Sequence, residues 1–307
     1  MLPPLRMRGH GTIVKMEYDE RYASFYRRAR LLGFVLQFKR KLPTLVHPDL
    51  TALIDRWRPE THIFHLACGE MTLTLEDWGM ITGLPLEGHA LTGRVEMKNW
   101  HERVVALIGD YPPDKKNQTS GVSLPWLLKY LSKCPEGADP RVVEQYVRAY
   151  LWYLLTEVVF PDCSGDTALW MYLDFLADWD AGYNWGATGL AYLYRSLDDA
   201  TRRTEATSGM SGCVWGLSIW MWERIPMGHP EKLRARAWTD YGEDGDDARY
   251  PTATYAWDVV GTILGESKAL YKIFINEHDA LTPLQDRLLW RCIVPMICVY
   301  AVKYHLP

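Results

Sequence analysis

The sequence lacks paired cysteines, a strong excess of one charge and a long apolar run, and each absence excludes a class of protein. No CxxC pair occurs, so reduced and mostly buried thiols in an intracellular protein fit best. The first residues lack the pattern of a secretory signal. The longest apolar run, residues 293–302, is about half the length of a membrane-spanning helix, so we expect a soluble protein. The six cysteines are Cys68, Cys134, Cys163, Cys213, Cys292 and Cys298.

Charge is nearly balanced over the chain but uneven along it. The net charge is −4, which argues against a surface dedicated to binding phosphates. Lys and Arg nevertheless outnumber Asp and Glu by ten to three in residues 1–45, which leaves −11 for the rest. We interpret the short basic run at residues 39–41 as a solvated helix end, with a nuclear-import or nucleic-acid patch as the alternative.

Aromatic residues, by contrast, are abundant, with 14 Trp and 18 Tyr. Large amphipathic rings either fill a core with their polar edge bonded or lie at interfaces. So many tryptophans indicate both uses. Trp215, Trp220 and Trp222 lie within one predicted helix, and core filling is favoured for them over a groove that binds a partner.

The periodicity predicts a fold class that is mainly α with a few short β-strands. We expect residues 1–18 to be a flexible leader and residues 19–307 to be a single compact multi-helix domain. A helix over residues 139–161 begins at Asp139-Pro140, ends at Pro161 and carries an outward i,i+4 pair of Glu144 with Arg148. The other predicted helices cover residues 20–40, 49–57, 168–178, 186–201, 212–224, 258–277 and 283–291, and residues 240–251 read as an exposed loop.

The most informative segment is residues 64–93, FHLACGEMTLTLEDWGMITGLPLEGHALTG. Alternating residues predict a small hairpin near residues 63–75. Thr74 is placed to cap a helix, with Asp77 at the third helical position, where a carboxylate can return a bond to the cap residue. Gly83 is placed as a left-handed terminator, and Pro85 blocks continuation of the helix.

Several residue clusters suggest chemistry, but each has a simpler interpretation. His62, His65 and Cys68 form the best metal-like cluster. Residues three apart on a strand point to opposite faces, so we expect His62 and His65 to diverge, with His65 packed in the core and bonded to the backbone near Glu70. The acidic run of Glu243, Asp244, Asp246 and Asp247 lacks the ligand spacing of a calcium loop.

Catalytic motifs do not emerge either. Lys268 and Lys272 lack the surroundings of a Schiff-base lysine. The glycines of residues 209–212 match neither a phosphate-binding loop nor a nucleophile elbow around Ser211. We therefore expect no catalytic, cofactor-binding or metal-binding residue. Glu223 and Arg224 read as a structural ion pair at a helix end.

Ordered blocks along the chain resemble the plant mobile domain family. The blocks begin at His47-Pro48 and Trp57-Arg58-Pro59, continue through residues 64–93, and span roughly residues 45–305. Several blocks in one order are more specific than a single motif. The later blocks are residues 148–151, 160–162, 184–186, 190–194, 222–226, 281–283 and 289–290.

The resemblance carries its own expectations. The family includes the MAINTENANCE OF MERISTEMS and MAIN-LIKE group and is also labelled aminotransferase-like, a name that the residues do not support. The resemblance implies a nuclear protein acting in transposon silencing, gene-expression control and meristem maintenance, together with a phosphatase-7-type long-form homologue. The family pattern usually continues past residues 305–307, and no phosphatase domain is attached, which suggests a truncated or divergent copy.

From these observations we expect a non-catalytic nuclear interaction domain that works through protein partners, without cofactor, metal or membrane. The alternatives are a DNA-binding module of transposon origin, using Arg27, Arg28, Arg30 and residues 39–41, and an enzyme whose site is scattered through the sequence.

Overall fold

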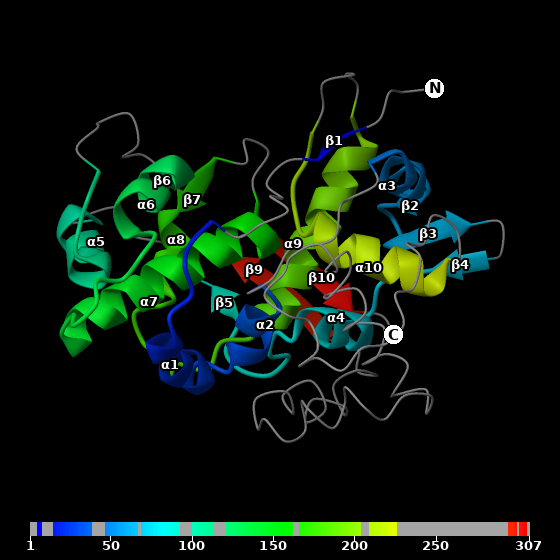
Figure 1. Ribbon diagram of the computed structural model, residues 1–307. Coiled ribbons are helices and arrows are strands. Elements are labelled where there is room, and N and C mark those ends of the chain that lie inside the picture. The colour runs from blue at the N-terminus through cyan, green and yellow to red at the C-terminus, as the bar shows by residue number, and fades with distance from the viewer. Residues whose placement is uncertain are drawn as a thin grey trace, which may run out of the picture.

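A computed structural model shows a mainly helical chain in which short strands connect and cover the helices (Figure 1). The fold class expected from the sequence, mainly α with a few short β-strands, is confirmed. The structure describes residues 5–7, 15–38, 47–66, 69–92, 100–112, 121–161, 166–203, 209–225, 294–299 and 301–305.

Helices make up most of the described residues. A 3₁₀ turn, η1 (Glu20–Tyr22), precedes the first α-helix, and a π-helical turn, η3 (Leu155–Val159), continues the seventh. The α-helices are α1 (Ala23–Arg28), α2 (Leu32–Gln37), α3 (His47–Ile54), α4 (Leu75–Thr82), α5 (Trp100–Ile108), α6 (Leu124–Leu131), α7 (Pro140–Leu154), α8 (Trp170–Asp174), α9 (Trp185–Thr201) and α10 (Val214–Arg224).

The strands in the described part of the chain form four small sheets. Two of these sheets are antiparallel, in the orders β2-β3-β4 and β6-β7, and the first contains the hairpin predicted near residues 63–75. The strands are β1 (Arg6–Met7), β2 (Trp57–Arg58), β3 (Ile63–Leu66), β4 (Gly69–Met71), β5 (Leu91–Thr92), β6 (Gly121–Ser123), β7 (Thr167–Leu169), β8 (Gly209–Met210), β9 (Val294–Val299) and β10 (Ala301–His305).

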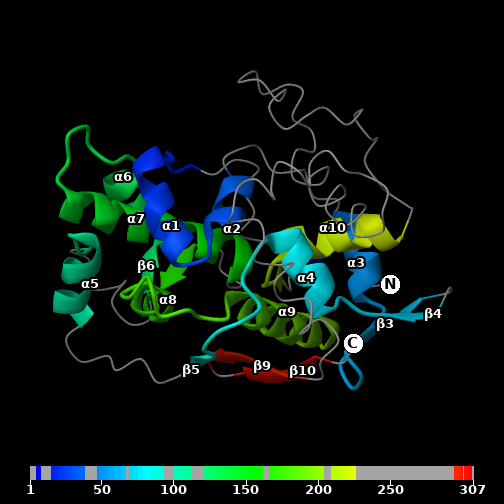
Figure 2. The same cartoon turned by 90° about the horizontal axis from the view of Figure 1, so that it is seen from below.

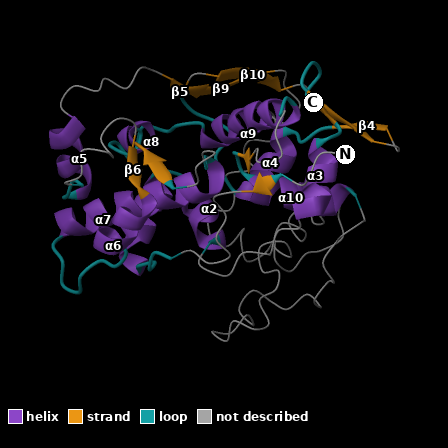
Figure 3. Ribbon diagram, turned by 90° about the horizontal axis from the view of Figure 1, so that it is seen from above, coloured by secondary structure: helices purple, strands orange, loops and turns teal. Residues whose placement is uncertain are grey.

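The other two sheets join distant parts of the chain. β1 pairs in parallel with β8, and β5 pairs in parallel with β9, whose antiparallel neighbour is β10. The β9–β10 hairpin lies along α9, so the C-terminal strands cover a central helix (Figures 2 and 3). Leu5, in the segment predicted as a flexible leader, is buried, and its N–H donates to Thr51 Oγ1 at 3.0 Å. Part of that segment therefore packs onto the domain.

The predicted helix over residues 20–40 is interrupted. Arg30 adopts a left-handed backbone with φ of 60°, and this turn separates α1 from α2. The predicted helix over residues 49–57 is also too long, because α3 ends at Ile54 and Trp57 begins β2. Residues 39–41 lie outside the described residues.

Helix α7 confirms the start predicted at Asp139, whose side chain accepts from the backbone N–H groups of Arg141 and Val142. The Glu144–Arg148 pair also forms, but Arg148 is buried and not on an outward face. Its guanidinium donates to Leu176 O at 3.0 Å, and burial lowers its pKa. This pair therefore fixes a loop against α7.

Farther along, two predicted helices are confirmed and one is corrected. Helices α9 and α10 match the predictions for residues 186–201 and 212–224. The helix predicted over residues 168–178 is wrong at its start, since residues 167–169 pair with β6 and only Trp170–Asp174 are helical. Three further predicted segments, residues 240–251, 258–277 and 283–291, lie outside the described residues.

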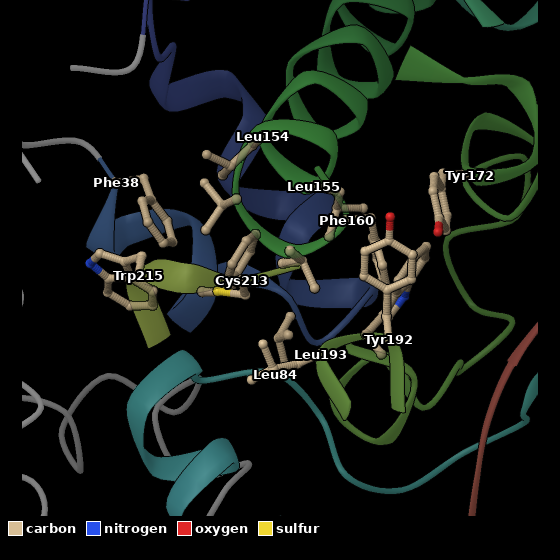
Figure 4. Close-up of a cluster of buried hydrophobic side chains, with 14 of the residues drawn as sticks. Phe38, Leu84, Leu154, Leu155, Phe160, Tyr172, Tyr192, Leu193, Cys213 and Trp215 are labelled. Atoms are coloured by element: carbon tan, nitrogen blue, oxygen red, sulfur yellow. The ribbon is translucent and has the colours of Figure 1, made fainter. Parts of the chain in front are cut away.

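The core lies where α2, α4, α7, α9 and α10 meet. Figure 4 shows aromatic and aliphatic side chains of this core, among them Leu154, Leu193 and Trp215 on the helices and Phe38 and Leu84 just after α2 and α4. Cys134 and Cys213 are free and buried, and burial raises the pKa of the Cys213 thiol to about 12. Trp215, Trp220 and Trp222 are all buried, so the core-filling interpretation is confirmed.

Two helix glycines make room for the indole of Trp78 in this core. A Cβ added at Gly216 would lie 2.7 Å from Trp78 Cζ3, and one at Gly189 would lie 2.9 Å from Val159 Cγ1. A side chain at Gly216 would press on the Trp78 indole, and one at Gly189 would press on both Val159 and Trp78, so α9 and α10 pack closely around this ring. None of the helices described by the structure is long and apolar enough to span a bilayer.

Candidate functional site

The signature segment, residues 64–93, contains the hairpin strands and α4, and it meets α9 and α10. Its polar side chains and those facing it form three joints. Each joint binds one part of the segment to an element that is distant in the sequence.

The first joint attaches β2 and the turn before the hairpin to α9 through Asp198. The indole of Trp57 donates to Asp198 Oδ1 at 2.8 Å, and His62 Nε2 lies 3.6 Å from Asp198 Oδ2. The His62 ring stacks on Trp57 and also contacts Tyr194. His62 has a left-handed backbone with φ of 56°, which turns the chain between β2 and β3 and directs this ring toward α9.

Tyr194, one helical turn before Asp198, completes this joint. Its phenol donates to Leu73 O at 2.7 Å and lies 3.0 Å from the hydroxyl of Thr72. Thr72 in turn donates to His62 O at 2.7 Å. Burial raises the pKa of Tyr194 well above its usual value, so the phenol keeps its proton and serves as a hydrogen-bond donor.

The second joint attaches α4 to α10 through Asp77. Thr74 and Asp77 form the predicted capping box, and Gly83 ends α4 in the predicted left-handed conformation with φ of 66°. Asp77 is buried, accepts from the indole of Trp220 at 3.2 Å, and forms an ion pair with Arg224. The ion pair expected between Glu223 and Arg224 is therefore corrected, because Arg224 pairs with a carboxylate 147 residues away.

The third joint attaches the loop after α4 to the start of α9. Asn184 Nδ2 donates to Leu86 O at 2.6 Å, and the N–H of Gly186 donates to Pro85 O at 2.8 Å. Gly88 has φ of 121°, and a Cβ there would lie 2.0 Å from Gly182 O. Two of the family-like blocks, residues 83–88 and 184–186, thus fit directly against each other.

One exposed part of the signature segment is the outer face of the hairpin, and residues 87–90 are also exposed. His65 Nε2 lies 2.6 Å from Glu70 Oε1, and these side chains are 54% and 60% exposed. The prediction of a core-packed His65 bonded to the backbone is therefore wrong. The register explains this: His65 lies directly opposite Glu70 on the face that turns away from the buried Phe64.

The structure does not assemble the candidate metal and catalytic residues in its described part. Nowhere in that part do three His, Cys, Asp or Glu side chains converge as metal ligands. His62 and His65 were predicted to diverge, and they have different carboxylate partners, Asp198 and Glu70. Ser211 donates to Ser196 Oγ at 3.0 Å. Cys68, Lys268, Lys272 and the acidic run at residues 243–247 lie outside the described residues.

The basic N-terminal helix also forms ion pairs. Arg28 pairs with Asp180 at 2.5 Å, and Arg30 Nη2 lies 4.0 Å from Glu87. The bond from Arg28 lowers the pKa of the Asp180 carboxyl. These contacts join α1 to the loops around the third joint, and their anionic partners offset the positive charge that the sequence concentrates there.

Sequence reasoning missed Tyr194 as a partner of the signature segment and Asp198 as the partner of Trp57 and His62 just before it. Both lie on α9, at positions i and i+4, among side chains that are almost all buried. The sequence indicates these residues only through a Tyr and an Asp four positions apart, which places them on one helix face. That spacing does not identify the element that they contact.

These joints define a class: a helical domain in which a capped helix and a small hairpin fix the packing of α9 and α10. A family model for the plant mobile domain matches residues 41–307. The chain belongs to this family.

Relatives in Arabidopsis thaliana give the same result. The chain is 31% identical to a serine/threonine-protein phosphatase 7 long form homolog over an alignment of 284 residues that covers 84% of this chain, and it is 38% identical over 191 residues to Protein MAIN-LIKE 1. It is 35% identical over 188 residues to Protein MAINTENANCE OF MERISTEMS. The chain spans 21% of the length of the long form homolog, 37% of MAIN-LIKE 1 and 38% of MAINTENANCE OF MERISTEMS. The alignments to the latter two cover 61% and 60% of this chain. No solved structure matches.

Proposed function

We propose that this chain is a non-catalytic interaction domain that acts through protein partners. The observation that supports the proposal is the use of the polar side chains in the signature segment and of those around it. His62, Thr72, Asp77, Tyr194 and Asp198 are each bonded to residues that position helices. Side chains bonded in this way stabilise the fold. The function is then carried out by the surface that the fold presents.

The setting proposed for this domain follows from its relatives. Names such as MAIN-LIKE and MAINTENANCE OF MERISTEMS suggest a role in meristem maintenance. We place the chain in the nucleus, where it would act in transposon silencing and gene-expression control. Its proposed partner is a phosphatase-7-type long-form homologue, which also resembles this chain in sequence.

A capture experiment tests the partner. The tagged full chain is immobilised and incubated with the purified long-form homologue, and retention is measured at rising salt. We expect the native immobilised chain to retain the homologue. The same chain, unfolded in urea with the homologue first removed, should retain none. Equal retention by native and unfolded chain, or none by either, would overturn this part of the proposal.

DNA binding is the competing function, and the ion pairs of Arg28 and Arg30 oppose it. A module that uses these cations on phosphates should bind duplex DNA most strongly at low salt. We expect no salt-sensitive binding of a duplex by the full chain. Binding that weakens steeply between 50 and 200 mM salt, by roughly a thousandfold for several phosphate contacts, would favour the DNA-binding module instead.

A further inference from the structure

Within the described residues, the hairpin of the signature segment ends in an open sheet edge. In the order β2-β3-β4, β4 has β3 on one side, and no strand of the described residues pairs with its other side. Figures 1 and 2 show the hairpin reaching past the helical body at one end of the molecule. Residues Gly69 and Glu70 are exposed. An open edge offers backbone N–H and C=O groups to another chain.

The alternation of hydrogen bonds along the antiparallel strands identifies which backbone groups face this edge. The N–H of His65 donates to Arg56 O at 2.9 Å, so His65 bonds toward β2. Bonding alternates along an antiparallel strand, and Phe64 and Leu66 therefore bond toward β4, opposite Met71 and Gly69. Glu70 lies opposite His65, and its own N–H and C=O must then point outward to the open edge.

The pleat defines the side chains that would flank an added strand. Glu70 lies on the exposed outer face with His65, whereas Met71 lies on the opposite face, beside the buried Phe64. A residue bonded to the backbone of Glu70 would place its side chain on the outer face next to that carboxylate. The residues before and after it would lie on the inner face, next to Met71.

We propose that β4 takes a fourth strand from a protein partner, in the form of an extended segment with a Lys or Arg between two apolar residues. The basic side chain would pair with Glu70, and one apolar neighbour would contact Met71. This inference rests on the proposed interaction role and deepens it by naming the surface and the chemistry of the partner segment.

Peptides test the register directly. The probes are two eight-residue peptides, identical except for a central Val-Lys-Val or Val-Glu-Val, titrated into the full chain. We expect the lysine peptide to bind about fivefold more tightly, as expected for one cross-strand ion pair, and to slow hydrogen exchange of the Glu70 amide. The Glu70→Lys variant should reverse the preference. Equal affinity for both peptides, or no slowing at the Glu70 amide, would overturn the proposal.

A second variant separates strand addition from simple charge attraction. Glu70→Pro removes the outward N–H and leaves the bonds between β3 and β4 in place, so the fold should persist by circular dichroism. Because Glu70→Pro also removes the carboxylate, its matched control is Glu70→Gln, which removes the charge and keeps the N–H. We expect Glu70→Gln to bind both peptides about equally and Glu70→Pro to bind neither. If the two variants bind the peptides alike, strand addition is excluded. Retention of the long-form homologue by a chain that binds neither peptide would leave the interaction role standing and place it on another surface.

Discussion

At the scale of single residues, the signature segment is explained by what each position must fit. Gly83 ends a helix in the left-handed region, and Gly88 passes against the carbonyl of Gly182. Thr74 and Asp77 satisfy the first turn of α4, and Asp77 also reaches α10. These local roles were predictable, because capping and termination depend on residues within four positions of each other.

A prediction at this scale concerns the glycine beneath Trp78. Gly216→Ala should lower the free energy of unfolding by about 1–3 kcal/mol, because the added Cβ would meet the rigid indole of Trp78 and forces repacking. Urea denaturation measures the change. In the background of Trp78→Phe, whose ring is smaller, the same substitution should cost less. An equal cost in both backgrounds would contradict the close contact.

At the scale of elements, the sequence predicted which segments are helices better than it predicted how they end or pair. Helices α4, α7, α9 and α10 follow from caps and periodicity. The break at Arg30 was missed because periodicity continues on both sides of it. The pairings of Arg224 with Asp77 and of Trp57 with Asp198 span more than 140 residues, and no local pattern encodes such contacts.

A tyrosine cluster between α1 and α7 gives a prediction at this scale. Tyr22, Tyr26 and Tyr150 are buried, their rings contact each other, and burial raises the pKa of each phenol well above 10. The unfolded chain ionises these phenols near pH 10 and the folded chain does not. Their contribution is therefore complete below pH 10 and is lost as pH rises above it.

We expect stability to fall by about 1 kcal/mol per buried phenol between pH 10 and 11. Urea denaturation across this range measures the fall, and absorbance at 295 nm should show these phenols ionising only as the chain unfolds. The Tyr26→Phe variant should show a shallower dependence on pH. Ionisation of all tyrosines near pH 10 in a folded chain would contradict the burial of the cluster.

At the scale of the whole molecule, a few long-range joints connect elements from both halves of the described chain. Parallel pairing of β5 with β9 and of β1 with β8 adds contacts between distant segments. The signature segment is therefore best understood as the junction of the domain. Its open edge at β4 is the surface proposed above for a partner strand.

The most direct test of this account is the urea unfolding of Asp77→Asn and Asp198→Asn. Asp77→Asn removes the buried carboxylate that joins the signature segment to α10, and Asp198→Asn removes the one that joins α9 to Trp57 and His62, just before the segment. We predict a loss of about 1–3 kcal/mol in each, and less than about 0.5 kcal/mol for the exposed control Glu87→Gln. If both Asn variants unfold at the same urea concentration as the native chain, the signature segment does not hold the domain together and the account is wrong.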